Sequence, residues 1–183
     1  MSTYQTWWSS DENEVNFGLR TGFYESAIAL IDKMIESESY KERDTFYFPI
    51  NFLYAHAMEL HLKELIMDLT GELVQGHDLK VLWDNLMVQF KLFLEDIGED
   101  IDNKMSHLKI LENEANNLSR DSIAFRYLMD KNGFYFNTEF EGDYESLKKQ
   151  MEKCHTLLEG LSIFIHQRTQ FLKEYESYLS DYY

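Results

Sequence analysis

The apolar pattern around which the rest of the chain is organised runs from residue 48 to residue 86 and predicts two consecutive helices. After Pro49 the apolar side chains recur every three or four positions, which places them on one broad face of a helix. They are Leu53, Tyr54, Ala57, Met58, Leu60, Leu62, Leu65 and Leu69. Because proline is tolerated in the first turn of a helix, we expect this helix to begin near Pro49 and to lie in the middle of a bundle.

A narrow polar strip formed by His56, Glu59 and Lys63 is the expected exposed side of this helix. Gly71 is a suitable residue to end the helix, and Asp78 can cap the helix that follows. The apolar residues of that second helix are Leu79, Leu82, Trp83, Leu86, Phe90, Phe93 and Leu94. The two helices form the predicted centre of an all-α fold.

Two amphipathic segments flank this pair. Ser10 and Asp11 can cap a helix that reaches about Ser37, and residues 37–44 form a polar connection. The expected inward row of that helix is Val15, Leu19, Phe23, Ala27, Leu30 and Met34. Residues 99–117 predict a surface helix with a single apolar stripe. The stripe consists of Ile101, Met105, Leu108, Leu111 and Ala115.

The interval 125–136 has a different pattern. Phe125 and Tyr127 precede Asn132 and Gly133, and further aromatic residues follow. Aromatic residues on both sides of an Asn-Gly pair are typical of a β-hairpin. A two-stranded hairpin is marginally stable alone, so we expect this small hairpin to lie against the helices.

The segment after Gly142 predicts one long C-terminal helix of about 50 Å. Its seam follows heptad spacing through Leu147, Met151, Cys154, Leu158, Leu161, Ile165, Arg168, Leu172, Tyr175 and Leu179. Either part of this seam meets a second subunit, or all of it packs within one chain. The interface candidates are Leu158, Leu161, Ile165, Arg168 and Leu172. Arg168, the one charged seam residue, should reach solvent or meet an acidic partner.

The composition favours a single helical domain over residues 1–183. Apolar residues make up 44% of the chain and aromatic residues 15%, while one proline and eight glycines leave few helix breakers. The lone Cys154 allows no disulfide within the chain. No apolar run is long enough for a transmembrane helix, and the N-terminus has no signal-peptide pattern. We expect a cytoplasmic protein without a cofactor.

The net charge of −16, from 33 acidic and 17 basic residues, shapes the choice of partners. An acidic surface repels the phosphate backbone, so nucleic acid is a disfavoured partner. A polybasic helix for a membrane surface is absent as well. The sequence also lacks a Gly-rich phosphate loop and a serine elbow, which leaves ATPase and hydrolase functions without support.

An apolar helix, a glycine-containing loop, a His-Asp-Leu turn and a leucine-rich helix follow one another between residues 59 and 82. The residues of this order are Glu59, Leu62, Lys63, Leu65, Gly76, His77, Asp78, Leu79 and Leu82. The order resembles the HEPN superfamily, and the resemblance covers residues 48–136, about half of the chain. Downstream, Ser119-Arg120-Asp121-Ser122 and Phe125-Arg126-Tyr127 resemble a stretch that ends Phe-Arg-Tyr-Pro in some HEPN-like proteins, with Leu128 in place of the proline. The resemblance implies a HEPN-like bundle of about five helices.

Catalytically active members of that superfamily are typically metal-independent RNases, in which a histidine follows an arginine after four to six residues. No arginine of this chain is followed by a histidine at that spacing, so the activity is not carried over. A divergent site would instead combine His77, Arg120, Arg126 and Tyr127, with the arginines holding phosphate. The alternative is that both arginines pair with nearby acids and hold the hairpin to the bundle.

Metal ligation has little support in the sequence. His56 and His61 stand about 140° apart around a helix, so they do not share a face. Glu152 and His155 form one Glu-x-x-His motif, whereas di-iron bundles need two such motifs and two further glutamates. We expect no metal site.

We therefore expect a non-catalytic, HEPN-like interaction module that forms a homodimer. The resemblance implies a setting among prokaryotic defence or toxin–antitoxin systems. One alternative is a divergent metal-independent RNase or nucleotide-binding protein that uses His77, Arg120 and Arg126. Another is an immunity partner, whose acidic surface mimics nucleic acid toward a basic toxin.

Overall fold

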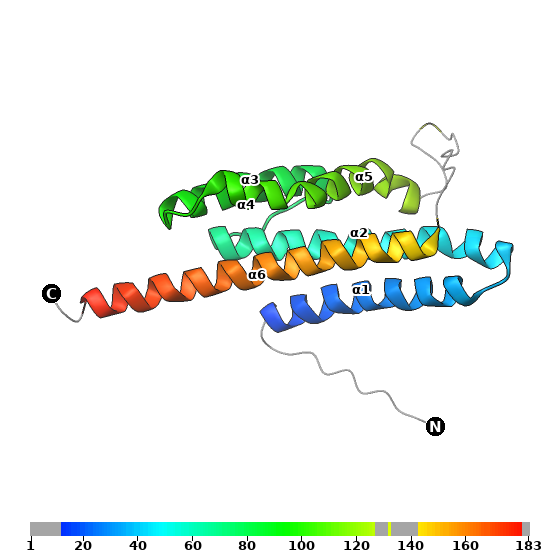
Figure 1. Ribbon diagram of the computed structural model, residues 1–183, viewed down its shortest axis with the longest axis horizontal. Coiled ribbons are helices and arrows are strands. Elements are labelled where there is room, and N and C mark those ends of the chain that lie inside the picture. Colours follow the sequence, from blue (N-terminus) through cyan, green and yellow to red (C-terminus); the bar gives the residue numbers. More distant parts are fainter. Residues whose placement is uncertain (1–11, 127–131, 133–142, 181–183) are drawn as a thin grey trace, which may run out of the picture.

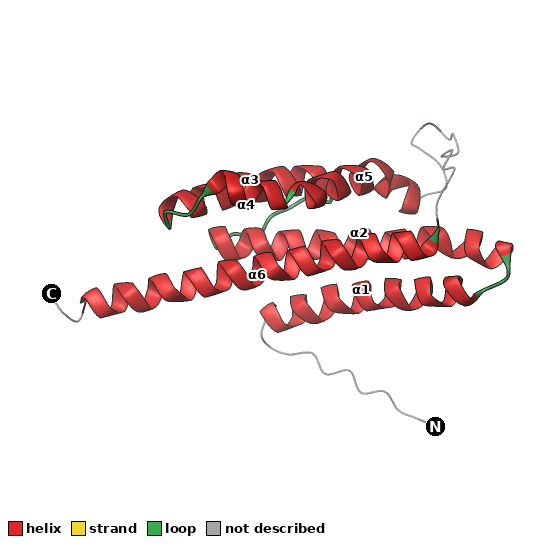
Figure 2. Ribbon diagram, in the orientation of Figure 1, coloured by secondary structure: helices red, strands yellow, loops and turns green. Residues whose placement is uncertain are grey.

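The described part of the chain folds into six helices. The computed structural model describes residues 12–126, 132 and 143–180. The helices, drawn in Figure 1, are α1 (Glu12–Glu36), α2 (Tyr40–Thr70), α3 (Leu79–Asp96), α4 (Ile101–His107), α5 (Lys109–Arg126) and α6 (Tyr144–Ser180). These residues contain no strand, as Figure 2 shows, so the all-α fold class is confirmed. None of these helices combines the length and the apolar character needed to cross a membrane.

Helix α2 occupies the middle of the bundle. It packs against α1, α3, α5 and α6. In Figure 1 it runs between α1 on one side and α3 with α5 on the other. As predicted, its buried apolar residues include Tyr54, Met58, Leu62 and Leu65. Removal of these side chains from water on several sides at once is the main favourable term in the stability of the bundle.

Helix α2 begins at Tyr40, well before the predicted start at Pro49. Ser39 is the N-cap, and its hydroxyl accepts a hydrogen bond from the Glu42 amide at 3.3 Å. The prediction of a polar connection over residues 37–44 is therefore wrong for most of its length. Pro49 lies exposed inside the helix, where it removes one helical hydrogen bond. Three half-buried aromatic residues before it attach the first turns to the bundle.

Helix α1 is rotated relative to the prediction. The buried residues are Arg20, Tyr24, Ala27, Ile31 and Met34. The prediction is right for Ala27 and Met34, whereas Phe23 and Leu30 are half-buried beside this row. The rotation places the charged Arg20 inward, where carboxylates of two other helices meet it.

Helices α3, α4 and α5 lie on the opposite side of α2 from α1 (Figure 1). Asp78 caps α3 as predicted, and its carboxylate accepts hydrogen bonds from two amides of the first turn. The single surface helix predicted over residues 99–117 is wrong, because the chain forms α4 and α5 with a break at Leu108. The Leu108 amide bonds to the Met105 carbonyl, which closes α4 with a tight turn. Leu108 is thereby buried in the core.

The hairpin predicted near 125–136 does not start where the sequence places it. Phe125 and Arg126 belong to α5, which continues past its predicted end at residue 117. Asn132 lies in a turn, and the other residues of the interval fall outside the described ones.

Helix α6 is the longest element, with 37 residues or about 55 Å, whereas α2 has 31 residues. The seam is buried from Met151 to Ile165 and mostly exposed beyond Ile165. In Figure 1 the C-terminal part of α6 projects past the ends of α1 and α2. Among the described residues, the packing of the seam on its own chain is therefore concentrated in its first half.

Truncation of Leu86 tests where α3 faces the core. Leu86 is fully buried, so Leu86→Ala leaves a cavity and should lower the free energy of unfolding by about 3 kcal/mol. Val88 on the same helix is exposed, and Val88→Ala should change that free energy by less than about 0.5 kcal/mol. Urea denaturation measures both values. Equal losses in the two variants would mean that α3 is turned differently.

Candidate functional site

Arg20 lies at the centre of a buried polar cluster between α1, α2 and α6. Its side chain is 4% exposed. Nε donates a hydrogen bond to Glu64 on α2 at 2.5 Å, and Nη1 donates one to Glu159 on α6. Nη1 also lies 3.4 Å from Nδ1 of His61 on α2. The guanidinium thus joins three helices, and its two carboxylate partners offset the cost of burying its charge.

His61 is held as a neutral imidazole in one tautomer. Burial, with the charges of Arg20 and His155, lowers its pKa to about 2. Arginine only donates hydrogen bonds, so Nδ1 of His61 accepts and the proton is on Nε2. Nε2 lies 2.8 Å from the hydroxyl of Ser162 and donates to it. Because a nitrogen that already carries a proton cannot take another from the hydroxyl, the pair is not a serine nucleophile with its base.

His61, His155 and Glu159 bring three metal-binding groups together. One ligand atom of each lies within 4.8 Å of the others. His155 is half-buried and stacks on Tyr24, with 3.8 Å between ring centroids. The guanidinium of Arg20 reaches both His61 and Glu159, so the cluster already contains its cation. A metal ion would have to displace that guanidinium, and the arrangement is best described as an arginine-centred ion cluster.

Glu59 forms a second buried cluster on α2. The sequence predicts an exposed strip here, which is wrong, because the Glu59 side chain is 2% exposed. Lys63 and His77 each place a nitrogen 2.8 Å from Oε1, and His56 lies 3.9 Å from Oε2. Burial by itself raises the pKa of Glu59, but these neighbours outweigh it and hold the pKa well below its usual range. An ionised Glu59 therefore ties the loop that carries His77 to α2.

Of the four catalytic candidates from the sequence, the structure describes the side chain of His77 alone. His77 lies on the loop before α3, and 68% of its side chain is exposed. The Ser119 hydroxyl donates to Asp78 at 2.5 Å, so the second half of α5 lies beside the start of α3. The structure does not describe the side chains of the other three candidates, Arg120, Arg126 and Tyr127. The first two have their backbone in α5.

The interface candidates from the sequence fall into two groups. Three are buried in the core of their own chain, which corrects the prediction for Leu158, Leu161 and Ile165. Helices α1 and α2 pack against α6 and leave these residues no surface for a second subunit. Arg168 lies beyond this point and pairs with Glu99, which gives it the expected acidic partner. Leu172, one turn further along, is half-buried.

Besides Glu59, the buried charges of Arg20 and Glu114 were not predicted from the sequence. Arg20 does have a sequence signal, because Tyr24 and Ala27 continue from it at spacings of four and three. Glu114 lies on a polar-looking segment and has no such signal. The Gln150 amide donates to Glu114, whose pKa is raised by burial. The burial of Glu114 can be recognised only when the packing of α5 on α2 and α6 is known.

Comparisons of the chain with protein-family models, curated proteins and solved structures find no match. Function must therefore be inferred from the chain's own residues. Within the described part, the Arg20 and Glu59 clusters satisfy their charges internally and hold helices together. The second half of α6 is one surface on which several large apolar side chains are exposed.

Replacement of Arg20 tests the ion cluster. Arg20→Met leaves Glu64 and Glu159 without their cation, so the free energy of unfolding should fall by about 3 kcal/mol near pH 7. Arg168→Met removes an exposed ion pair and should cost less than about 1 kcal/mol. Similar costs for the two variants would contradict the structural role of the cluster.

The pH dependence of the same variant has a defined sign. Burial raises the pKa of Glu64 above its ordinary value of 4.5, and Arg20 opposes that rise. Without Arg20 the pKa of the folded state rises further, so folded Glu64 binds a proton that unfolded Glu64 has lost. The stability of Arg20→Met should therefore fall more steeply than that of the unmodified protein as pH rises from 5 to 8. Urea denaturation across this range measures the slope, and parallel curves would contradict it.

Proposed function

We propose that the protein is a non-catalytic, HEPN-like interaction module that forms a homodimer through the projecting end of α6. The observation that carries this proposal is a set of exposed apolar side chains beyond Ile165. They are Phe171, Tyr175, Tyr178 and Leu179. Large apolar side chains gathered on one helix face mark interaction sites more often than scattered ones do.

These side chains lie on one face of α6. Spacings of four and three connect Phe171, Tyr175 and Tyr178, and the half-buried Leu172 and the exposed Leu179 lie beside them. At 100° per residue the five side chains cover about 120° of the helix. The rings of Phe171 and Tyr175 are stacked, with centroids 6.4 Å apart. A second helix with the same stripe would cover this face.

The buried half of the seam runs directly into this face. Phe164 packs edge-on against Phe90 and Phe93 of α3, and Arg168 binds Glu99 just after α3. The C-terminal turns of α6 project past the other helices, as Figure 1 shows. Among the described residues, the same side of α6 is therefore covered by its own chain up to Arg168 and mostly exposed beyond it.

Charge also favours a second copy at this end. Residues 166–180 contain two cations, Arg168 and Lys173, and two anions, Glu174 and Glu176, which sum to zero. The whole chain carries −16, so two copies repel each other over most of their surfaces. A neutral apolar strip is where this repulsion is smallest. In a two-fold dimer the same patch of both subunits meets, so each patch must be complementary to itself. A strip that carries both signs of charge can meet this requirement.

The resemblance to the HEPN superfamily supports the same proposal. It rests on the loop around His77, Asp78 and Leu79 and on the two helices that flank it. It suggests a setting in prokaryotic defence or toxin–antitoxin systems, with a protein partner in addition to the second copy. The missing arginine–histidine spacing supports a role in binding rather than RNA cleavage.

A second candidate is a divergent RNase or nucleotide-binding site at His77, Arg120 and Arg126. One observation favours it: the hydrogen bond from Ser119 to Asp78 brings α5 beside the exposed His77. The ion pair of His77 with Glu59 and the net charge of the chain speak against it. RNA cleavage by the purified protein that is lost in His77→Ala would establish this candidate instead.

A glutamate on the apolar strip tests the dimer. Tyr175→Glu places a charge on the strip at an exposed position, so the fold should be kept while the dissociation constant rises at least about tenfold. Ile163→Glu is the matched control, because Ile163 is equally exposed but lies about 120° from Tyr175 around the helix. Sedimentation equilibrium over a wide concentration range measures both. A monomeric unmodified protein, or an unchanged dimer in Tyr175→Glu, would contradict the proposal.

A further inference from the structure

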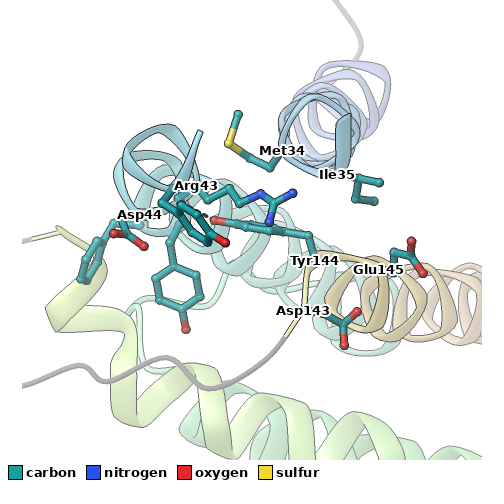
Figure 3. A pocket seen from close by; sticks show the side chains of 10 residues that line it. Met34, Ile35, Arg43, Asp44, Asp143, Tyr144 and Glu145 are labelled. Carbon is teal, nitrogen blue, oxygen red and sulfur yellow. Dashed lines mark hydrogen bonds between the residues drawn. The ribbon is translucent and has the colours of Figure 1, made fainter. Parts of the chain in front are cut away.

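A pocket of about 630 Å³ opens at the other end of the bundle, where α1 ends and α2 and α6 begin. This is far from the projecting end of α6, so the pocket is independent of the proposed dimer strip. Its volume is in the range of sites that hold small organic molecules. Figure 3 shows side chains from all three helices around it.

The walls of the pocket are largely aromatic. Tyr40, Tyr47 and Phe48 from α2 line it together with Tyr144 from α6, and Met34 closes it from α1. The Tyr144 hydroxyl donates to the backbone carbonyl of Arg43, which fixes the start of α6 against the first turns of α2. Aromatic faces held in place by such contacts favour a planar ring as the ligand.

Arg43 supplies a positive charge inside the pocket. In Figure 3 its guanidinium reaches from α2 toward the end of α1, above Tyr144. Nε of Arg43 is buried and has no hydrogen-bond acceptor among the described residues. The guanidinium also has no carboxylate partner in that part of the chain, although the protein has 33 acidic residues. An unpaired buried donor on a cation is costly, and a ligand carboxylate would satisfy it.

Three carboxylates line the same pocket: Asp44, Asp143 and Glu145. Asp143 is used as the cap of α6, since its two oxygens accept from the amide and the hydroxyl of Ser146. Asp44 and Glu145 remain as acceptors at the edge. With one cation and three anions, the lining disfavours a ligand of high negative charge. It suits a ligand that carries one carboxylate and one ammonium group.

We propose that this pocket binds a free aromatic amino acid. The ring lies against the tyrosine and phenylalanine walls, the carboxylate accepts hydrogen bonds from Arg43, and the ammonium group faces Asp44, on the opposite side of Arg43 from Glu145 in Figure 3. The two charged ends of such a ligand match the two signs of charge in the lining. This inference goes beyond the proposed interaction module and does not depend on it.

Isothermal titration with L-tryptophan tests the assignment, with two analogues as controls. Tryptamine lacks the carboxylate and indole-3-propionate lacks the ammonium group, so each should bind at least tenfold more weakly than L-tryptophan. Arg43→Met should weaken L-tryptophan binding at least tenfold. Lys41→Met removes an exposed cation two residues before Arg43, about 160° away around the helix and outside the lining, and should leave binding unchanged.

Three results would overturn the proposal: no binding of L-tryptophan, equal binding in Arg43→Met, or equal binding of indole-3-propionate and L-tryptophan. Circular dichroism shows whether Arg43→Met keeps its helices. If it does not, the double variant Asp44→Asn/Glu145→Gln replaces it, because both positions are exposed. That variant should lose at least tenfold in affinity for L-tryptophan and none for indole-3-propionate, and equal effects on both ligands would refute the proposed orientation.

Discussion

A central helix that neighbours enclose on several sides must satisfy its polar side chains inside the protein. Helix α2 is in this position and buries Asn51, Glu59 and His61. Asn51 donates to the Tyr47 carbonyl one turn earlier, and Glu59 is met by Lys63 and a loop histidine. His61 needs groups from two other helices. Since an unpaired buried polar group costs roughly 1–3 kcal/mol, the pairings of His61 with α1 and α6 and of Glu59 with His77 fix how these segments align with α2.

Arg20 sets that alignment for α1 and α6. Apolar contact between helices tolerates small rotations and shifts, whereas a guanidinium shared by Glu64 and Glu159 tolerates few. With Glu159 held at this point, the buried seam of α6 runs to Ile165, and the remaining turns extend beyond the bundle. The free end of α6 is thus a consequence of where the ion cluster holds the helix and of the greater length of α6.

The sequence predicted what periodicity and capping determine locally. The all-α class, the central helix, the Asp78 cap and the long heptad helix are all correct. Several of the errors arise because a polar residue or a polar segment was expected to face water or to lie outside a helix. Arg20 and Glu59 are buried because partners from distant segments meet them, and Ser39 starts a helix that Pro49 was expected to start. The cluster around Arg20 joins residues up to 139 positions apart, which no local pattern displays.

The two halves of α6 have different partners in the proposed arrangement: its own chain before Ile165 and a second copy of the protein after Arg168. Hydrogen exchange of the α6 amides, followed at low and high protein concentration, tests this most directly. Amides of residues 151–165 should exchange slowly at every concentration. Amides of residues 170–180 should exchange fast when the protein is dilute and slowly when it is concentrated. Fast exchange of residues 170–180 at all concentrations would contradict the claim.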